Sequence, residues 1–382
     1  MALRHCHNVA DFRLLAKKKL PAPIFHYMDG AADDELTLKR STAAFDDYEL
    51  IPNYLVDVEK IDMTTEILGQ KIEWPVFLSP TGMSRLFHYK GEPVVARAAA
   101  RAGTLYSLST LATTSIEDVA ASSDGPKMFQ IYVLKDRGLN KEFIERCRAA
   151  NFAALCLTVD VPVAGNRERD YYTGMTLPPR FTLGSMLSFA AHPAWTFHQL
   201  FSKKIDLANV SHRFAGGSGG TTSVIEYMNS QFDRTVTWDD AAKMIDMWGG
   251  PFAIKGILSV QDAKRAAEIG ATAIMVSAHG GRQMDSVPAP IDQIGRIADA
   301  VGDRIEIILD GGVRRGSHVL KALAMGARAC SIGRAYLFGL AAGGEAGVDR
   351  ALSLLRAEVE RGMILLGCKQ IDQIDGSLIR AR

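Results

Sequence analysis

Residues 277–285 read SAHGGRQMD and place a histidine and an arginine three positions apart, directly behind the apolar run AIMV. An imidazole can accept or donate a proton near neutral pH, and a guanidinium can bind a carboxylate through two parallel hydrogen bonds. A surface turn would use the glycines but gives no reason for His279 and Arg282 to follow a buried strand. The stretch is therefore a candidate for proton transfer beside a bound anion.

Two glycine–arginine turns occur later in the chain, DGGVRRG at 310–316 and SIGRAY at 331–336. Each offers glycine amides that can approach an anion closely, a following helix N-terminus and an arginine, Arg314 or Arg334. Either turn alone could be ordinary turn chemistry. If they follow the last two strands of an α/β barrel, where such folds often bind phosphate, together they favour a phosphate-bearing ligand.

Eight short β-rich runs could position these groups, and they alternate with helical patterns from residue 76 onward. They are VFLS (76–79), TLYSLS (104–109), MFQIYV (128–133), ALCLTV (154–159), FAIKG (252–256), AIMVS (273–277), IEIILD (305–310) and ARACSIG (327–333). Nearly continuous apolar runs indicate a sheet covered on both faces. Amphipathic stretches such as GEPVVARAAARAG and GSHVLKALAMG lie between them and end at glycines, as helices often do. Eight such units predict an α/β fold, a closed (β/α)8 TIM barrel.

Polar side chains stand at the ends of the other predicted strands, where a barrel of this type binds its substrate. They are Gln130 and Tyr132 in the third run, Thr158 and Asp160 at the end of the fourth, and Lys255 in the fifth. A lysine inside an apolar barrel is unfavourable unless an anion compensates its charge. Lys255 therefore needs a partner at the barrel mouth, either a bound ligand or a neighbouring carboxylate in a structural ion pair.

Two segments extend beyond the barrel pattern. Residues 1–70 are predicted to be a helical extension that packs on the barrel of residues 71–382, with helices over DFRLLAKKKLP and DDELTLKRSTAAF. The insertion at 163–236, after the fourth strand, is too long for an ordinary loop. It contains LPPRFTLGSMLSFAAHPAWTFHQLFSKK and then AGGSGGTTS, which is predicted to be flexible. The insertion could be a lid, rest on a bilayer surface, or pack against the barrel or a neighbouring subunit, and these interpretations stay open.

Composition excludes several classes of protein. Apolar residues make up 47% of the 382 positions and charged residues 23%, which is typical of a globular protein. The 44 basic and 43 acidic side chains nearly cancel, so nucleic acid is not an expected partner. Five scattered cysteines and an N-terminus without a signal-peptide core predict a cytoplasmic protein. No metal is expected, because His5, Cys6 and His7 lack the spacing to converge on one ion.

SAHGGRQMD, together with LTVDVP, FQIYV, AIKGI, LDGGVRRG and SIGRAYLFG, resembles the FMN-dependent α-hydroxy-acid dehydrogenase and oxidase family. This family includes glycolate oxidase, bacterial L-lactate dehydrogenase and mandelate dehydrogenase. The likeness covers nearly the whole chain, from KLPAPIFHYMDGAADD onward, and the order and spacing of the motifs make it specific. The resemblance, and not the strand pattern, implies FMN as cofactor and a 2-hydroxy acid as substrate.

Residue by residue, the resemblance implies that His279 is the active-site base and that Asp160 faces it. The residues implied to hold the substrate carboxylate are Tyr27, Arg167 and Arg282, and Tyr132 would bond to the substrate hydroxyl. Oxidation removes two electrons and two protons, so a neutral imidazole must accept one proton, and a nearby carboxylate stabilises the imidazolium that results. The proton could come from the α-carbon or from the hydroxyl, and both routes use the same groups.

The same resemblance implies the contacts to FMN. Lys255 would lie beside the N1 and O2 edge of the flavin, where an ammonium makes the ring a better electron acceptor. The residues implied to surround the ring are Pro80, Thr81, Gly82, Ser109, Gln130, Thr158 and Ser277. Those implied at the phosphate are Gly312, Arg314, Gly333 and Arg334, and Asp310 is also assigned to the cofactor site.

Two positions depart from the family pattern. The family usually has asparagine where this chain has Ala278, which implies the loss of one polar contact near the flavin or its loop. Leu111 stands where plant glycolate oxidases carry a large aromatic residue, so the pocket is aliphatic there. A substrate larger than glycolate is consistent with this change.

The predicted activity is FMN-dependent oxidation of an L-2-hydroxy acid, foremost L-lactate, with electrons passed to quinone and the respiratory chain. RERD and the HPAW-containing insertion resemble bacterial lactate and mandelate dehydrogenases, which implies peripheral contact with the inner face of the cell membrane. A homotetramer is expected from the family. The alternatives are a mandelate-type dehydrogenase, an oxidase that releases hydrogen peroxide, a flavin-free aldolase or isomerase barrel, and an inactive binding module.

Overall fold

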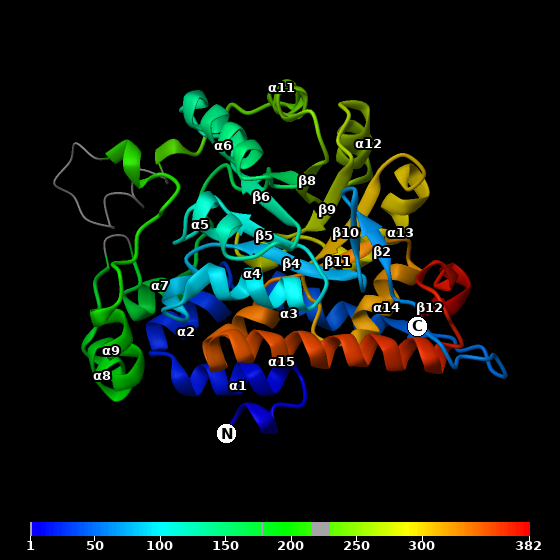
Figure 1. The fold of residues 1–382 in the computed structure, drawn as a ribbon, viewed down its shortest axis with the longest axis horizontal. Helices are drawn as coiled ribbons and strands as arrows, with labels where there is room; N and C mark the ends of the chain where they lie inside the picture. The colour runs from blue at the N-terminus through cyan, green and yellow to red at the C-terminus, as the bar shows by residue number, and fades with distance from the viewer. Residues whose placement is uncertain (1, 177–178, 215–229) are drawn as a thin grey trace.

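The predicted barrel is present in the computed structural model, which describes residues 2–176, 179–214 and 230–382. Eight parallel strands close on themselves in the order β10-β11-β4-β5-β6-β7-β8-β9 (Figure 1). Their bounds are β4 Val76–Thr81, β5 Tyr106–Ser109, β6 Lys127–Ile131, β7 Ala154–Thr158, β8 Phe252–Ile257, β9 Ala273–Ser277, β10 Glu306–Asp310 and β11 Ala329–Ile332. Each strand corresponds to one of the eight predicted runs, so the predicted fold class is confirmed.

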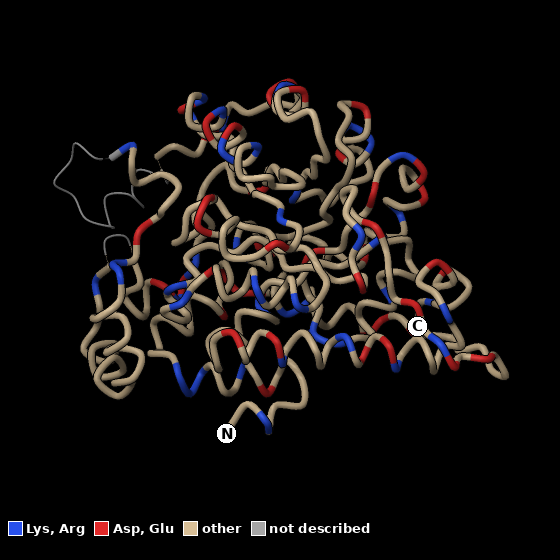
Figure 2. Tube along the Cα trace, in the orientation of Figure 1, with Lys and Arg blue, Asp and Glu red and all other residues tan. Residues whose placement is uncertain are grey.

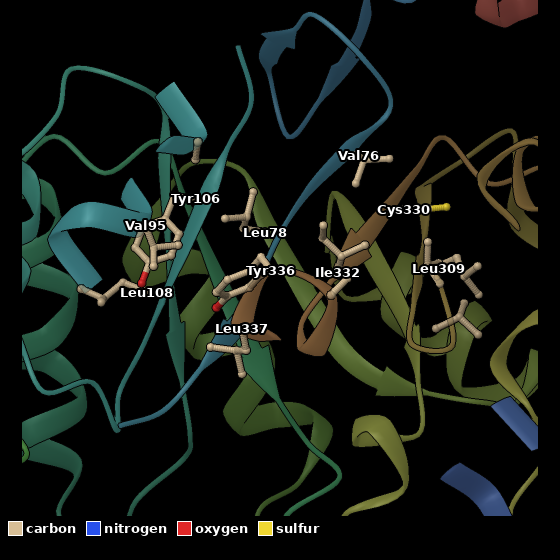
Figure 3. Packing of buried hydrophobic residues seen from close by; sticks show 14 of the residues in the cluster. Val76, Leu78, Val95, Tyr106, Leu108, Leu309, Cys330, Ile332, Tyr336 and Leu337 are labelled. Carbon is tan, nitrogen blue, oxygen red and sulfur yellow. The ribbon is translucent and has the colours of Figure 1, made fainter. Parts of the chain in front are cut away.

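The strands are buried on both faces, as their continuous apolar sequences predicted. Between the strands and the surrounding helices, Leu78, Tyr106 and Tyr336 belong to one large apolar layer (Figure 3). A second buried cluster joins barrel residues to a hairpin made of β2 (Thr65–Ile67) and β3 (Gln70–Ile72). Leu68 in this hairpin donates its backbone N–H to Glu306 at the start of β10, at 2.8 Å. The hairpin therefore covers the N-terminal end of the barrel and leaves the C-terminal end for ligands.

The barrel helices are α4 Gly91–Arg101, α5 Ile116–Ala121, α6 Arg137–Ala149, α11 Trp238–Trp248, α12 Val260–Glu268, α13 Pro290–Val301, α14 Gly316–Ala324 and α15 Arg334–Leu366. Several begin at a side chain that caps them. Ser115, Asp136 and Ser259 each accept a hydrogen bond from the backbone N–H three residues later. Such caps satisfy amide groups that the first helical turn leaves without a partner.

Three helices precede the barrel, α1 (Val9–Lys19), α2 (Ala22–Asp29) and α3 (Leu36–Ala43). Helices at α1 and α3 were predicted; α2 was not, because APIFHYMD begins without a side chain that caps it. Helix α1 runs along α15 (Figure 1), and β1 (Tyr48–Leu50) pairs with β12 (Ile379–Ala381). The division into residues 1–70 and 71–382 stays a prediction, and the β2–β3 hairpin spans that boundary.

The insertion after β7 contains α7 (Glu168–Thr173), α8 (Leu183–Ala191), α9 (Pro193–Phe201) and a short turn of 3-10 helix, η4 (Ser211–Phe214). It is fixed to another 3-10 turn, η3 (Ser84–Leu86), which follows β4. Trp195 Nε1 donates to the carbonyl of Leu86 at 2.9 Å, and Gln199 Nε2 donates to that of Arg85 at 2.6 Å. The predicted flexible run AGGSGGTTS lies outside the described residues.

Helices α8 and α9 form an apolar projection at the side of the barrel (Figure 1). Residues 183–201 contain no Lys, Arg, Asp or Glu, so both helices are tan in Figure 2, and Lys203 and Lys204 follow them. Their exposed apolar side chains are Leu183, Met186, Leu187, Phe197, Leu200 and Phe201. Across the residues that the structure describes, no helix is both long and apolar enough to cross a bilayer.

Candidate active site

A cavity of about 1010 Å³ opens at the C-terminal ends of the barrel strands. The predicted site residues that line it are Tyr27, Pro80, Thr81, Gly82, Ser109, Tyr132, Arg167, Lys255, His279, Arg282, Asp310, Gly312, Arg314, Gly333 and Arg334. The other four, Gln130, Thr158, Asp160 and Ser277, are joined to this group through hydrogen bonds or strand pairing. The structure therefore brings all the predicted site residues together at one end of the barrel.

His279 and Asp160 form a hydrogen-bonded pair at the cavity wall. The Nδ1 atom of His279 lies 2.8 Å from Asp160 Oδ1, so Nε2 is the ring nitrogen left for a ligand. His279 has a φ of +53°, which an L-residue adopts at a cost and which indicates that its orientation is imposed. At Gly256 a Cβ atom would lie 2.8 Å from Asp160 Cγ, so the glycine after Lys255 admits the carboxylate. The pair can accept a proton and stabilise the resulting imidazolium.

Arg282 and Arg167 both pack against the ring of Tyr27, with guanidinium carbons 5.0 Å and 5.8 Å from the ring centroid. Arg282 Nη1 donates to the backbone carbonyls of Tyr27 and Gly30, while Arg167 Nε donates to Asp170 Oδ2 at 2.9 Å. Burial, followed by repulsion from Arg167, lowers the pKa of Arg282 to about 10. An anion placed between the two arginines would offset both causes and raise the pKa of Arg282 again.

Arg314 and Arg334 line the part of the cavity beside the two glycine–arginine turns. Burial lowers the pKa of Arg314 to about 10 and that of Arg334 to about 9. The side-chain hydrogen bonds of Arg334 go to neutral acceptors, the carbonyls of Met28, Gly30 and Gly280. Because these carbonyls are neutral, they leave the charge of the half-buried guanidinium groups without a counter-ion, which favours an anionic ligand. The two glycine–arginine turns predicted such a ligand.

Lys255 and Asp310 form a buried ion pair of 2.8 Å between Nζ and Oδ2. Asp310 also accepts hydrogen bonds of 2.5–2.6 Å from the hydroxyls of Ser79, Ser277 and Ser331. Burial alone would raise the pKa of Asp310, but Lys255 and the hydroxyls outweigh burial and lower it to about 2. Asp310 is thus a carboxylate with every oxygen engaged.

Two partners were predicted for Lys255, a bound ligand or a neighbouring carboxylate, and the carboxylate is present. Burial would lower the pKa of Lys255, but the charge of Asp310 outweighs burial and raises it. Asp310 was assigned to the cofactor site, and within this chain it accepts hydrogen bonds from three serine hydroxyls. A contact between the flavin and either residue stays a prediction. Lys255 still lines the cavity, so the pair presents a fixed ammonium there.

Gln130 Nε2 and Thr158 Oγ1 are buried near the barrel mouth and have no hydrogen-bond partner within the described residues. Gln130 Oε1 is held by Ser109 Oγ at 3.1 Å, which leaves the amide nitrogen to donate elsewhere. Buried polar groups are nearly always paired in folded proteins. A flat ligand with acceptor atoms along its edge fits these two residues and Lys255, and this agrees with a flavin ring.

Gly312 and Gly281 serve the packing of α3. A Cβ on Gly312 would lie 1.8 Å from the carbonyl oxygen of Ser41, and one on Gly281 would lie 2.7 Å from the backbone nitrogen of Leu38. Both glycines also have positive φ values. Gly312 was expected to be a glycine for the sake of the phosphate, but the close approach of α3 already requires it.

Several residues of the site were missed by sequence reasoning. Asp170 orients Arg167 through a hydrogen bond. The only sequence signal for this pair was the separation of three residues, at which two side chains can meet on one face of a helix. The apolar walls of the cavity come from distant segments and had no signal beyond hydrophobicity; they include Met83, Leu86, Phe87, Phe189, Trp195 and Phe232. Asp285 accepts hydrogen bonds from the backbone N–H groups of Leu36 and Thr37, and so fixes the loop after His279 to α3.

A barrel with a histidine–aspartate pair, two groups of arginines and unpaired polar atoms in one cavity is an enzyme that binds an anionic substrate and a phosphate-bearing cofactor. The model of the family described as FMN-dependent dehydrogenase matches residues 16–381, and the chain belongs to this family. FMN is therefore its cofactor, and its chemistry is oxidation–reduction.

Relatives of known name cover almost the whole chain. An L-lactate dehydrogenase of Ectopseudomonas mendocina is 40% identical over 370 residues, 97% of each chain. An L-lactate oxidase of Nostoc is 41% identical over 376 residues, again 97% of each chain. The crystal structure of the monotopic membrane protein (S)-mandelate dehydrogenase has a TM-score of 0.94 and 34% identity, and covers 99% of this chain and 100% of its own. The solved structure therefore shares the fold of this chain along its whole length.

Proposed function

We propose that this enzyme oxidises an L-2-hydroxy acid, foremost L-lactate, to the 2-oxo acid. The observation that carries the proposal is that Arg167 and Arg282 pack on Tyr27 within the cavity that His279 lines. This arrangement can hold a carboxylate within reach of a base. Lactate is chosen because the relatives named above include an L-lactate dehydrogenase and an L-lactate oxidase.

In the proposed mechanism, Arg167, Arg282 and Tyr27 bind the substrate carboxylate and fix the α-carbon before chemistry. Tyr132 lies buried on the cavity wall, and burial, then Asp160, raises the pKa of its hydroxyl. The phenol therefore stays protonated and can donate a hydrogen bond to the substrate hydroxyl or to a developing oxyanion. These contacts explain how the substrate is oriented.

His279 accepts one of the two protons that the substrate loses, at Nε2, and Asp160 stabilises the imidazolium from the Nδ1 side. The proton can leave from the α-carbon or the hydroxyl with the same groups in place. Bound FMN supplies the two-electron acceptor. The apolar side chains around the cavity keep bulk water away from the charged groups.

The cofactor would be held by three sets of residues. Ser109, Gln130, Thr158, Lys255 and Ser277 would contact the ring system or support that contact; Pro80, Thr81 and Gly82 would form the wall beside it; and Gly312, Arg314, Gly333 and Arg334 would receive the phosphate. The unpaired atoms of Gln130 and Thr158 and the lowered pKa values of Arg314 and Arg334 support these assignments. Ala278 is buried beside Ser277 and brings no polar side chain to the loop.

The first experiment tests the reaction itself. Purified protein should be yellow, and its flavin absorbance should bleach under anaerobic conditions when L-lactate is added. Glycolate, mandelate and longer 2-hydroxy acids in the same assay measure the preference for the acid's side chain. The aliphatic Leu111 on the cavity wall favours acids larger than glycolate, and (S)-mandelate is the specific alternative substrate. A protein that does not take up FMN, or a flavin that no 2-hydroxy acid bleaches, contradicts the proposal.

We also propose that electrons pass to a quinone at the inner face of the cell membrane, with α8 and α9 resting on the bilayer. Their exposed apolar side chains and the following lysine pair fit a surface of anionic lipid. The (S)-mandelate dehydrogenase whose crystal structure resembles this chain is itself a monotopic membrane protein. The protein would be otherwise cytoplasmic and, like the family, a homotetramer, for which size-exclusion chromatography with light scattering is the test.

Replacing Leu200 and Phe201 with serine should weaken binding to anionic vesicles at least about tenfold, because each side chain contributes about 1.5–3 kcal/mol when buried in an apolar phase. The control is Leu14→Ser, an exposed leucine on α1. Wild-type protein that does not sediment with vesicles contradicts the membrane proposal. Peroxide release in place of reduction of a soluble quinone would instead identify the oxidase alternative, which the L-lactate oxidase relative favours.

A further inference from the structure

Arg169 connects the insertion to the helix that carries Tyr27. It lies in α7, two residues after Arg167, and its side chain extends to the C-terminal end of α2. Arg169 Nη1 is 3.1 Å from Asp29 Oδ2, and Nη2 donates to Glu35 Oε2. Asp29 and Glu35 are both buried, whereas the Arg169 side chain is 32% exposed, so the contact is partly shielded from solvent. A partly buried ion pair is screened by salt less than an exposed one.

The segment that Arg169 holds is part of the proposed carboxylate site. Asp29 follows Tyr27 by two residues, and the carbonyls of Tyr27 and Gly30 accept hydrogen bonds from Arg282. Arg282 therefore binds the end of α2 from the barrel through hydrogen bonds, while Arg169 binds it from the insertion through an ion pair. These two contacts together determine where the Tyr27 ring lies relative to Arg167 and Arg282, which pack on it.

Arg167 is set by the same helix, α7. It is the residue that precedes the first turn, and its Nε donates to Asp170 in that turn. A shift of α7 away from α2 would therefore carry Arg167 away from Tyr27. A displacement of about 1 Å in a binding group is enough to change reaction rates or affinities markedly.

We propose that Arg169 is a positioning residue that fixes the distance between Arg167 and Tyr27 by tying α7 to α2, and so sets the affinity for the substrate carboxylate. The inference rests on the proposed function, because it assumes that the substrate carboxylate binds at Arg167, Arg282 and Tyr27. Arg169 acts through these residues and is not assigned any contact with the substrate.

The chain offers a matched control. Arg13 in α1 binds the same carboxylate as Arg169, through two hydrogen bonds of 2.6 and 2.8 Å to Asp29. Arg13 ties α2 to α1, whereas Arg169 ties α2 to the insertion. Removing either arginine leaves Asp29 with one cationic partner. Arg169→Met also removes the cation from the buried Glu35, which keeps a hydrogen bond from the backbone N–H of Ala31, so the stability of each variant is measured beside its affinity. The two variants differ in which helix is released.

The experiment compares Arg169→Met, Arg13→Met and Arg169→Lys as FMN-loaded full-length proteins. The concentration dependence of anaerobic flavin reduction by L-lactate gives the Kd for the acid and the limiting rate separately. Arg169→Met should raise the Kd about tenfold and lower the limiting rate by a smaller factor, since the base and cofactor are untouched but the α-carbon is held less firmly. Arg13→Met should leave the Kd within about twofold. Arg169→Lys should recover part of the affinity, because an ammonium cannot bridge two carboxylates as a fork does.

The outcomes separate the inference from the proposed function. If no 2-hydroxy acid reduces the wild-type flavin, the proposed function fails. If the wild type reacts and Arg169→Met binds the acid normally, or both methionine variants lose affinity equally, the positioning role is wrong. FMN content and thermal unfolding temperature are measured for each variant. Should Arg169→Met not retain FMN, Arg169→Lys decides: a Kd raised about threefold with a smaller change in the limiting rate supports the role, and an unchanged Kd overturns it.

Discussion

Two aspartates stand at the same barrel mouth, each paired with a cationic or basic side chain, and their surroundings differ. Asp310 accepts from Lys255 and from three serine hydroxyls, so both of its oxygens are engaged. Asp160 contacts His279 through Oδ1, while its Oδ2 has no hydrogen-bond partner within the described residues. One pair is closed on all sides, and the other is partly open.

The difference separates two uses of a carboxylate. A fully bonded ion pair keeps both charges at fixed positions, because a proton or a new ligand would have to displace existing hydrogen bonds. A pair with spare acceptor capacity can respond when its histidine gains a proton. We therefore expect the Lys255–Asp310 pair to provide a constant field and the His279–Asp160 pair to take part in proton transfer.

The largest expected effect comes from the open pair. His279→Ala should reduce the anaerobic rate of flavin reduction by about 10³-fold or more, since a positioned base contributes about 10²–10⁴-fold. Asp160→Asn should reduce it less, because the base remains. FMN absorbance should persist in both variants, as neither residue is assigned to the cofactor. A rate for His279→Ala close to the wild type would show that another residue is the base.

Breaking the closed pair should affect stability more than a surface pair would. Lys255→Met leaves Asp310 buried without its cation, which costs about 3–5 kcal/mol in the free energy of unfolding. The double variant with Asp310→Asn removes both charges and should recover part of that loss. Urea unfolding of the proteins measures both values. Equal stability of the single and double variants would mean that the two charges do not interact as the geometry indicates.

A smaller effect is expected from acid. Because the folded pKa of Asp310 is about 2 and the ordinary value is 3.8, its ionised form stabilises the folded protein above about pH 4, and that contribution is lost as the pH falls toward 2. The difference corresponds to about 2 kcal/mol. Unfolding free energies between pH 5 and pH 2.5 should fall less steeply for Asp310→Asn than for the wild type. Parallel pH profiles would remove the closed pair as a contributor to acid stability.

The sequence predicted the barrel well because each strand is a separate apolar run, and glycines mark the ends of several helices between the runs. It also placed His279, Arg282, Arg314 and Arg334 at strand ends, where the fold itself brings them together. The partner of Lys255 stayed open, because Asp310 lies on β10, and only the strand order β8-β9-β10 brings it near. Pairs such as Arg169 with Asp29 were not predicted, since they depend on how α7 docks on α2.

The packing of α1 along α15 has a consequence for biosynthesis. Helix α1 is synthesised before every barrel strand and α15 after all of them, and Lys19 donates a hydrogen bond to the carbonyl of Ala342 within α15. The segment with Tyr27 follows α1 directly, so its support from α1 and α15 is complete only when α15 has left the ribosome. A stop codon within α15 should therefore weaken substrate binding by residues that are synthesised about 300 positions earlier.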